Sequence, residues 1–236
     1  MNGSRRVRWP LRSSTALLGL LGGGMALHRR YRNWGATPEE IRAAFPGDEL
    51  VPEPAGSTTR AVTIEAPADD VWPWLVQMGQ GRAGLYSYDW LENLVGLDIH
   101  SSWGIEEELQ HLEVGDRIRL VPDGWMGLPQ GMALPVALIE PGRSIVLRED
   151  PSEGPWNGVW SFHVVPIGPD RCRLVSRGRA TRQGLLARIA DELMDPVTLL
   201  MTRKMLLGIK ARSEQRRATE QLASGAGGNQ PDVRRH

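Results

Sequence analysis

The sequence predicts an α+β fold in which a curved antiparallel sheet wraps around a long C-terminal helix. Two patterns support this prediction. Between residues 117 and 179, short runs alternate between apolar and polar residues and are separated by Gly and Pro, which is typical of antiparallel strands. From residue 183 to about 222, apolar residues recur every three or four positions, which is the period of a helix. The length of 236 residues fits one domain with appendages.

Charge and cysteine content narrow the possible functions. The 28 basic and 28 acidic residues cancel, so the sequence does not predict a nucleic-acid partner. Cys172 is the single cysteine, which excludes an internal disulfide, and no histidines and carboxylates have the spacing of a metal site. We therefore expect no metal and no cofactor. Nine tryptophans beside two phenylalanines are unusual and suit cavity walls or a membrane interface.

Residues 1–33 form an apolar segment flanked by arginines. The apolar run, residues 13–27, is shorter than the ~20 residues that span a bilayer and resembles the apolar part of a signal peptide in length. Arg29, Arg30 and Arg32 follow it, and positive charge there opposes export. Arginine side chains can reach the membrane surface, which allows a short helix to be retained. We expect a single-pass membrane anchor. The alternatives are a cleaved export signal and an unanchored tail, and arginines on both flanks leave the orientation open.

Residues 34–58 are predicted to form a short helix and a linker. Thr37 can cap the helix, Pro38 suits its first position, and Glu40 completes a capping box. The helix should end near Phe45, because a Pro-Gly pair follows. Two prolines and a glycine in residues 51–57 then indicate a linker.

The domain itself is predicted over residues 59–223. It begins with a strand at 60–65, followed by a helix up to Met78, a glycine-rich loop and a short helix at 88–95. Five further strands are expected at 117–121, 133–139, 144–148, 158–167 and 171–179. The tail, residues 224–236, is rich in glycine and is predicted to be disordered.

Two details of these strands and the last helix are specific. Pro141 and Gly142 fit the central positions of a type II turn. Trp160, Phe162 and Val164 share one strand face, which we predict to be the inward one. The last helix should be divided by a proline at position 196.

Several short fragments, taken in order, resemble a known superfamily. They are Val62-Thr63-Ile64, Ala66-Pro67 with Val71-Trp72, Val114-Gly115-Asp116, Trp160-Ser161-Phe162, Arg173-Leu174-Val175 and the stretch from Met205 to Lys210. Their order is similar to the START-like superfamily (SRPBCC) of polyketide cyclases and lipid-transfer proteins, over roughly residues 34–222. The resemblance implies a helix-grip fold with a cavity for a hydrophobic small molecule between the sheet and the long helix. Members range from lipid carriers to cyclases, so the fold does not settle the function.

Eight residues are candidates to bind a ligand in such a cavity. They are Arg82, Tyr86, Tyr88 and Trp90 beside the glycine-rich loop, and Trp160, Phe162, Met201 and Met205 on the facing strand and helix. The first four could orient a ligand headgroup, because pockets are mostly apolar with a few placed polar groups. The alternative is that their rings only close the end of the sheet. The glycine-rich loop lacks the Lys-Ser/Thr pair of a P-loop, so we do not expect a nucleotide site.

The remaining polar residues are expected to be structural. Arg173, Arg177 and Arg179 share a strand face that we expect to be convex and solvated; the alternative is a surface for anionic lipid or a partner. Glu149 and Asp150 could form an acid–base pair at a strand end, although a solvated turn is the commoner arrangement.

His163 lies on the strand face opposite Trp160, so we expect it to be exposed or packed rather than catalytic.

Three functions are compatible with these residues. The first is a membrane-associated domain that binds a lipid, isoprenoid or polyketide-like molecule in its cavity. The second is a cyclase or dehydratase that uses Tyr86, Tyr88 or Asp89 in the same cavity. The third is an interaction module whose interior is filled by its own side chains. No acid–base pair is recognisable in the sequence, which favours the first function over the second.

Cell fractionation tests the predicted anchor. If residues 1–33 are retained, the intact protein should sediment with membranes, and a variant that begins at Trp34 should stay in the soluble fraction. A mature N-terminus just after Ala26 would identify a cleaved signal instead. A soluble full-length chain would contradict the anchor.

Overall fold

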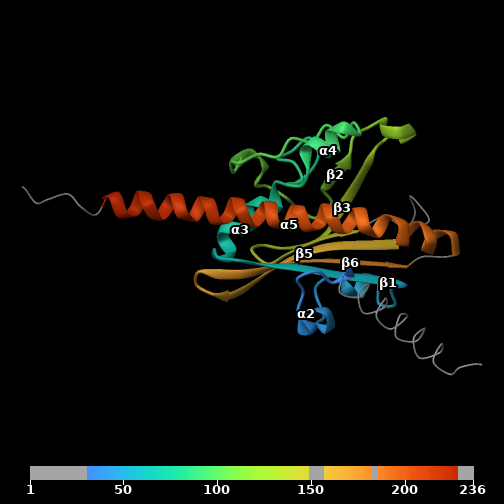
Figure 1. Ribbon diagram of the computed structural model, residues 1–236, viewed down its shortest axis with the longest axis horizontal. Helices are drawn as coiled ribbons and strands as arrows, with labels where there is room; N and C mark the ends of the chain where they lie inside the picture. The colour runs from blue at the N-terminus through green and yellow to red at the C-terminus, as the bar shows by residue number, and fades with distance from the viewer. Residues whose placement is uncertain (1–30, 149–156, 182–184, 228–236) are drawn as a thin grey trace, which may run out of the picture.

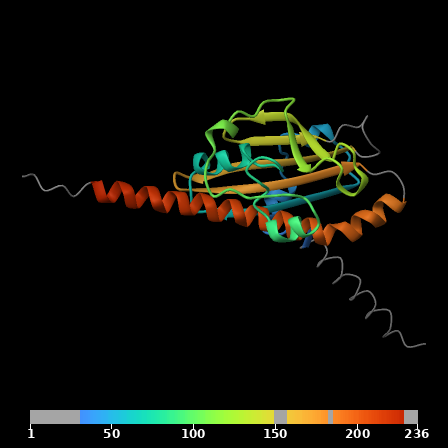
Figure 2. The same cartoon turned by 90° about the horizontal axis from the view of Figure 1, so that it is seen from above.

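The computed structural model describes residues 31–148, 157–181 and 185–227, and in the last helix the side chains of residues 194–222. Six antiparallel strands form one sheet in the order β1-β6-β5-β4-β3-β2, so the first strand pairs with the last. The long helix α5 lies along this sheet (Figure 1). Seen from above, α5 extends past the sheet at its C-terminal end (Figure 2). This arrangement is the predicted α+β helix-grip fold.

The elements follow the predicted order. The strands are β1 (Gly56–Ile64), β2 (Arg117–Val121), β3 (Met132–Glu140), β4 (Ser144–Arg148), β5 (Asn157–Gly168) and β6 (Arg171–Thr181). The helices are α2 (Pro38–Arg42), α3 (Ala68–Val76), α4 (Asp89–Leu94) and α5 (Leu185–Gly227), with short 3-10 turns at Asp48–Leu50 (η1), Glu107–Leu109 (η2) and Trp125–Gly127 (η3). The capping box of α2 is confirmed, because Thr37 and Glu40 exchange hydrogen bonds between side chain and backbone.

Several boundaries differ from the prediction. α5 continues to Gly227, so residues 224–227, which were predicted to belong to a disordered tail, are helical. β1 begins at Gly56, inside the stretch predicted to be a linker, because its pairing with β6 extends to Ala180. The last helix is not divided: α5 is one continuous helix with Pro196 inside it. A proline removes one backbone donor, and packing against the sheet can hold the remaining turns together.

The inner face of the sheet carries the core. Val62, Leu174 and Val164 lie opposite one another on β1, β6 and β5. Phe162 and Val164 are buried in one cluster with Leu206 of α5, and Trp160 packs against that cluster. The prediction that the Trp160 face points inward is therefore confirmed.

α5 approaches the loop ahead of α4 most closely at Gly208. A Cβ atom on Gly208 would lie 2.2 Å from the Tyr86 backbone oxygen, so only glycine fits at this position. Tyr86 itself is buried and has a positive φ of 57°. The contact holds the loop, and with it the start of α4, against the helix.

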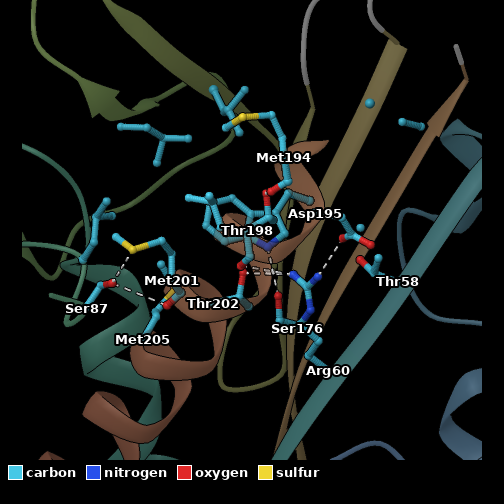
Figure 3. Close-up of a pocket in the computed structure, with 18 of the residues that line it drawn as sticks. Thr58, Arg60, Ser87, Ser176, Met194, Asp195, Thr198, Met201, Thr202 and Met205 are labelled. Atoms are coloured by element: carbon cyan, nitrogen blue, oxygen red, sulfur yellow. Dashed lines mark hydrogen bonds and ion pairs between the residues drawn. The ribbon is translucent and has the colours of Figure 1, made fainter. Parts of the chain in front are cut away.

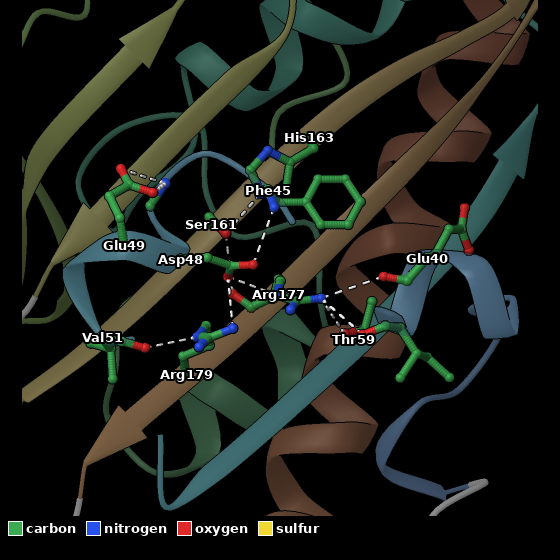
Figure 4. Close-up of polar contacts among 12 residues, drawn as sticks. Glu40, Phe45, Asp48, Glu49, Val51, Thr59, Ser161, His163, Arg177 and Arg179 are labelled. Carbon is green, nitrogen blue, oxygen red and sulfur yellow. Dashed lines mark hydrogen bonds and ion pairs between the residues drawn. The ribbon is translucent and has the colours of Figure 1, made fainter. Parts of the chain in front are cut away.

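The outer face of β6 is covered rather than solvated, so this prediction was wrong. Asp48 of η1 accepts a 2.8 Å hydrogen bond from Arg177 Nε and lies 3.4 Å from Arg179 Nη1 (Figure 4). Arg173 Nη2 pairs with Glu40 at 2.7 Å. Arg177 retains only 5% exposure. The arginines hold the segment around α2 and η1 onto the sheet, which leaves neither a lipid surface nor a partner surface at these three side chains.

His163 lies beneath the same segment. Its ring stacks on Phe45 with 4.5 Å between centroids, and its nitrogens lie 3.1 Å from Ser144 Oγ and 2.8 Å from Ser161 Oγ. Burial lowers the pKa of His163 to about 4, which keeps the ring neutral. The histidine is packed, one of the two placements that the sequence predicts.

Several predictions fall on residues outside the part of the chain that the structure describes. These are the apolar run at 13–27, the pair Glu149 and Asp150, and the tail from 228 onward. Among the residues that are described, no helix is both long and apolar enough to cross a membrane.

The turn between β3 and β4 gives a first structural prediction. Arg143 N donates to Glu140 O at 2.9 Å, and Gly142 has φ of 73°, as a type II turn requires. No atom lies within 4 Å of a Cβ built at Gly142, so strain there comes from the backbone alone. Gly142→Val should lower the free energy of unfolding by ~1–3 kcal/mol, and Gly142→Asn by less, because asparagine tolerates positive φ.

Gly168 provides a matched control for this turn. A Cβ at this position would also meet open space, and Gly168 has no positive φ, so Gly168→Val should change stability little. Denaturant unfolding of the three variants measures the difference. Equal losses for Gly142→Val and Gly142→Asn would contradict the turn assignment.

Burial of neutral His163 predicts a pH-dependent stability. Its folded pKa of about 4 lies below the unfolded value of ~6.5, so protons bind preferentially to the unfolded chain. The contribution of His163 is complete above pH ~6.5 and is lost as the pH falls toward 4. Between pH 7.5 and pH 5, the wild type should lose about 2 kcal/mol more unfolding free energy than His163→Gln.

Urea unfolding at the two pH values measures this difference. The control is His111→Gln, because His111 is exposed. Between pH 7.5 and pH 5, His111→Gln should lose as much unfolding free energy as the wild type. The same loss in His163→Gln would show that His163 does not titrate as its burial implies.

Candidate functional site

A cavity of about 580 Å³ lies between the inner face of the sheet and the first part of α5 (Figure 3). Its walls come from strands β1, β2, β3, β5 and β6, from the region of α4, and from α5. Large apolar side chains supply one part of the lining: Leu85, Leu97, Leu120, Met132, Leu134, Val159, Trp160, Met194, Val197, Met201 and Met205. Polar side chains supply another part: Arg32, Thr58, Arg60, Ser87, Glu92, Ser176, Arg179, Asp195, Thr198 and Thr202. The apolar part favours an apolar occupant, because the transfer of apolar surface out of water is favourable.

The space exists because one end of the sheet carries small residues. Gly56, Ala180 and Gly158 lie opposite one another on β1, β6 and β5. In the next row, Gly178 lies beside Trp160. These rows leave room between the strands and α5, whereas the rows beyond them carry the large residues of the core.

Arg60 is the first polar group in this wall. It lies on the same face of β1 as Val62 and Ile64, so its side chain points into the interior. Only 3% of its surface is exposed. Arg60 Nη2 donates to Asp195 Oδ1 at 3.2 Å and Nη1 donates to Thr202 Oγ1 at 3.1 Å. Burial lowers the pKa of Arg60, and the Asp195 carboxylate opposes this effect. Arg60 Nε is buried without a hydrogen-bond partner among the described residues.

Asp195 is shared between two arginines. Its Oδ2 lies 3.4 Å from Arg32 Nε, and Arg32 also lines the cavity. Figure 3 shows Asp195, Thr202 and Arg60 meeting where α5 crosses the sheet. Asp195 therefore lies between two guanidinium groups, and the polar groups at this end of the cavity suit a polar end of a ligand.

Glu92 of α4 is the second polar group in the wall. It lines the cavity, is 2% exposed, and its Oε2 has no hydrogen-bond partner in the described part of the chain. Burial and, to a smaller extent, the charge of Asp89 together raise the pKa of Glu92 to about 7, although the Ser87 hydroxyl acts to lower it. The carboxyl can therefore be neutral or ionised near physiological pH, which is the range that acid–base chemistry needs.

Three of the eight predicted ligand residues line the cavity: Trp160, Met201 and Met205. Trp160 Nε1 donates to Ser176 Oγ at 2.9 Å, which fixes the indole in the wall. Met201 lies beside Ser87, whose Oγ is 3.7 Å from its sulfur. Sheet and helix thus meet across this space as the sequence predicts.

The other five predicted residues are not among those that line it. They are Arg82, Tyr86, Tyr88, Trp90 and Phe162. Phe162 is fully buried in the core, and Trp90 is 69% exposed. Arg82 donates to the backbone oxygens of residues 76 and 109, while Tyr86 and Tyr88 lie under the cations of residues 212 and 204. Arg82, Tyr86 and Tyr88 therefore hold the glycine-rich loop and the start of α4, and Trp90 lies at the surface.

Arg60, Asp195 and Glu92 were not predicted from the sequence. A signal for Arg60 was present, because it has the same strand parity as Val62 and Ile64 and should therefore face the core. Asp195 and Glu92 carry no such signal, since their burial depends on how α4 and α5 pack. Within residues 31–148, 157–181 and 185–227, no three His, Cys, Asp or Glu side chains are grouped to hold a metal ion.

No known family model matches the sequence of this chain, and no curated protein matches it.

The fold is similar to several solved structures. A norcoclaurine synthase point mutant from Thalictrum flavum has a TM-score of 0.40 at 17% identity, over 69% of this chain and 96% of that one. An aromatase/cyclase from Streptomyces sp. R1128 has a TM-score of 0.40 at 17% sequence identity, over 68% of this chain and 94% of that one. A hypothetical protein from Helicobacter pylori has a TM-score of 0.45 at 14% sequence identity, over 75% of this chain and 99% of that one. Such low scores do not bear on function. The resemblance to the START-like superfamily is confirmed at the level of the fold, by the strand order and the C-terminal helix of this chain.

Proposed function

We propose that this domain binds a hydrophobic small molecule, of lipid, isoprenoid or polyketide-like kind, between the sheet and α5. The observation that carries the proposal is the 580 Å³ cavity, which is walled by leucine, methionine and tryptophan side chains together with polar groups such as Arg60 and Glu92. Ligand sites usually enclose ~300–1,000 Å³ and have this composition. Such a volume also supports ligand binding over an interior filled by the protein's own side chains.

The polar groups suggest how the ligand is oriented. Arg60 cannot act as a free cation, because Asp195 already pairs with it. Its Nε, which has no partner among the described residues, still offers one donor. A ligand with an apolar body and one polar end would place that end at Arg60 and its body against the leucines and methionines.

A cyclase or dehydratase that uses Tyr86, Tyr88 or Asp89 gains no support from the geometry. None of the three is among the residues that line the cavity. Both carboxylate oxygens of Asp89 accept hydrogen bonds from Ser101, at 2.7 Å each. Tyr86 is 1% exposed beneath the guanidinium of Arg212. Any reaction in this cavity would need other groups.

Attachment to a membrane through residues 1–33 stays a prediction. Residues 1–30 lie outside the described part of the chain, and binding of a ligand in the cavity does not depend on them. The fractionation experiment above addresses attachment separately from ligand binding.

Thermal unfolding of the full chain with added ligands tests the proposal. The panel contains fatty acids, sterols, isoprenoids and aromatic polyketides. A ligand present at ~100 times its Kd stabilises the folded state by ~2.7 kcal/mol, which corresponds to a rise in Tm of roughly 5–10 °C for a domain of this size. At least one member of the panel should produce a concentration-dependent rise.

Two tryptophan substitutions localise the effect. Leu134→Trp places an indole in the cavity wall and should abolish the rise. Val165→Trp, on an exposed position of β5, is the control and should keep it. The cavity does not extend to Val164, so a tryptophan there would overpack the core instead. No rise with any ligand, or an unchanged rise in Leu134→Trp, would contradict binding in this cavity.

A further inference from the structure

Glu92 is a buried acid that no structural role accounts for. The carboxylates around it have partners: Asp89 binds Ser101, and Asp195 binds Arg60 and Arg32. Glu92 instead lines the cavity with Oε2 unpartnered among the described residues. An unpaired charge in such a wall is costly, so the group is more stable when it holds a proton.

A neutral carboxyl is a hydrogen-bond donor as well as an acceptor. The terminal torsion of a glutamate is broad, so the carboxyl group can turn toward an occupant of the cavity at little cost. Glu92 Oε2 has no hydrogen-bond partner among the described residues, so this oxygen is open to a ligand. In an apolar wall, an acceptor with no proton of its own would be the best partner for this O–H.

We propose that Glu92 recognises its ligand as a proton-bearing donor, and that the ligand is a hydrophobic molecule with a carbonyl oxygen at the α4 end of the cavity. This inference rests on the proposed binding of a hydrophobic ligand and adds the chemical group that is recognised. Once ionised, the carboxylate faces the carbonyl oxygen with negative charge and no proton, so recognition is lost as the pH rises.

The other charged groups near the cavity do not replace this role. Asp89, on the same helix, is the charge that acts on Glu92 and favours its protonated form. On α5, Lys204 lies over the Tyr88 ring at 5.5 Å, and Asp195 is held by the Arg60 of β1. The side chains that β2 and β3 contribute to the wall are apolar: Leu120, Met132 and Leu134.

A matched pair of neutral probes tests the inference: 9-fluorenone, which has one carbonyl, and fluorene, which lacks it. Neither probe titrates, so any pH dependence comes from the protein. The measured quantity is the ratio of the Kd for fluorene to the Kd for fluorenone, obtained from tryptophan fluorescence titrations of the full chain. In the wild type, the ratio should be about ten-fold higher at pH 6 than at pH 8.5, which corresponds to one net hydrogen bond.

Three variants separate Glu92 from other donors. Glu92→Gln keeps a donor but does not titrate, so its ratio should stay high at both pH values. Glu92→Leu removes the donor, so its ratio should be near one at both. Glu53→Gln changes an exposed acid and should behave as the wild type. A pH-independent wild-type ratio, or a high ratio in Glu92→Leu, would overturn the inference and assign the carbonyl to a group such as Arg60.

Ligand binding and the role of Glu92 fail in different ways. If both probes bind with equal affinity at both pH values, ligand binding stands and the role of Glu92 is wrong. If neither probe binds the wild type and the wider panel gives no rise in Tm, both are wrong.

A measurement without ligand checks the titration itself. The wild-type carboxyl must ionise in an apolar wall as the pH rises, so Glu92→Gln should gain Tm relative to the wild type between pH 5 and pH 8. A Tm difference that does not change over this range would also overturn the inference.

Discussion

The pairing of β1 with β6 is the constraint on which both faces of the sheet depend. It joins the first strand to the last in a continuous register from Gly56 to Ile64. On the inner face, this register brings Arg60 opposite Ser176 and beneath Asp195 of α5. On the outer face, it sets Thr59 opposite Arg177, whose guanidinium donates to Thr59 Oγ1 and binds the segment ahead of β1. A shift by one residue would exchange the two faces and bury the wrong side chains.

Arg60 and Glu92 are two ionisable groups of the cavity wall, and each avoids an unpaired charge in its own way. Arg60 stays charged, since a guanidinium does not lose its proton in proteins, and Asp195 compensates it. Glu92 forms no ion pair with any residue that the structure describes, and burial favours its neutral form. Breaking the Arg60 pair would leave a buried charge, whereas adding a partner to Glu92 would remove an unsatisfied group. The Arg60–Asp195 pair is therefore a fixed part of the fold, whereas the Glu92 carboxyl is available to a ligand.

Local patterns in the sequence predicted the elements well, because they depend on near neighbours. The capping box at Thr37 and the glycine turn at Gly142 are of this kind. Predictions failed where the answer depends on distant segments. Arg177 was placed in solvent because the stretch that contains Asp48 reads as a linker and gives no sign that it folds back over the sheet. Glu92 was missed because a six-residue helix shows no face of its own until its neighbours are in place.

The cavity and the core occupy the same strands, and side-chain size decides where one ends and the other begins. On β5 and β6, Gly158 and Gly178 leave space under the first part of α5, while Phe162 and Leu174 fill it further along. Backbone pairing is unbroken across this boundary, so the space needs no distortion of the sheet. A ligand would therefore occupy the volume that larger side chains fill in the core, and its size is limited by the row that contains Phe162.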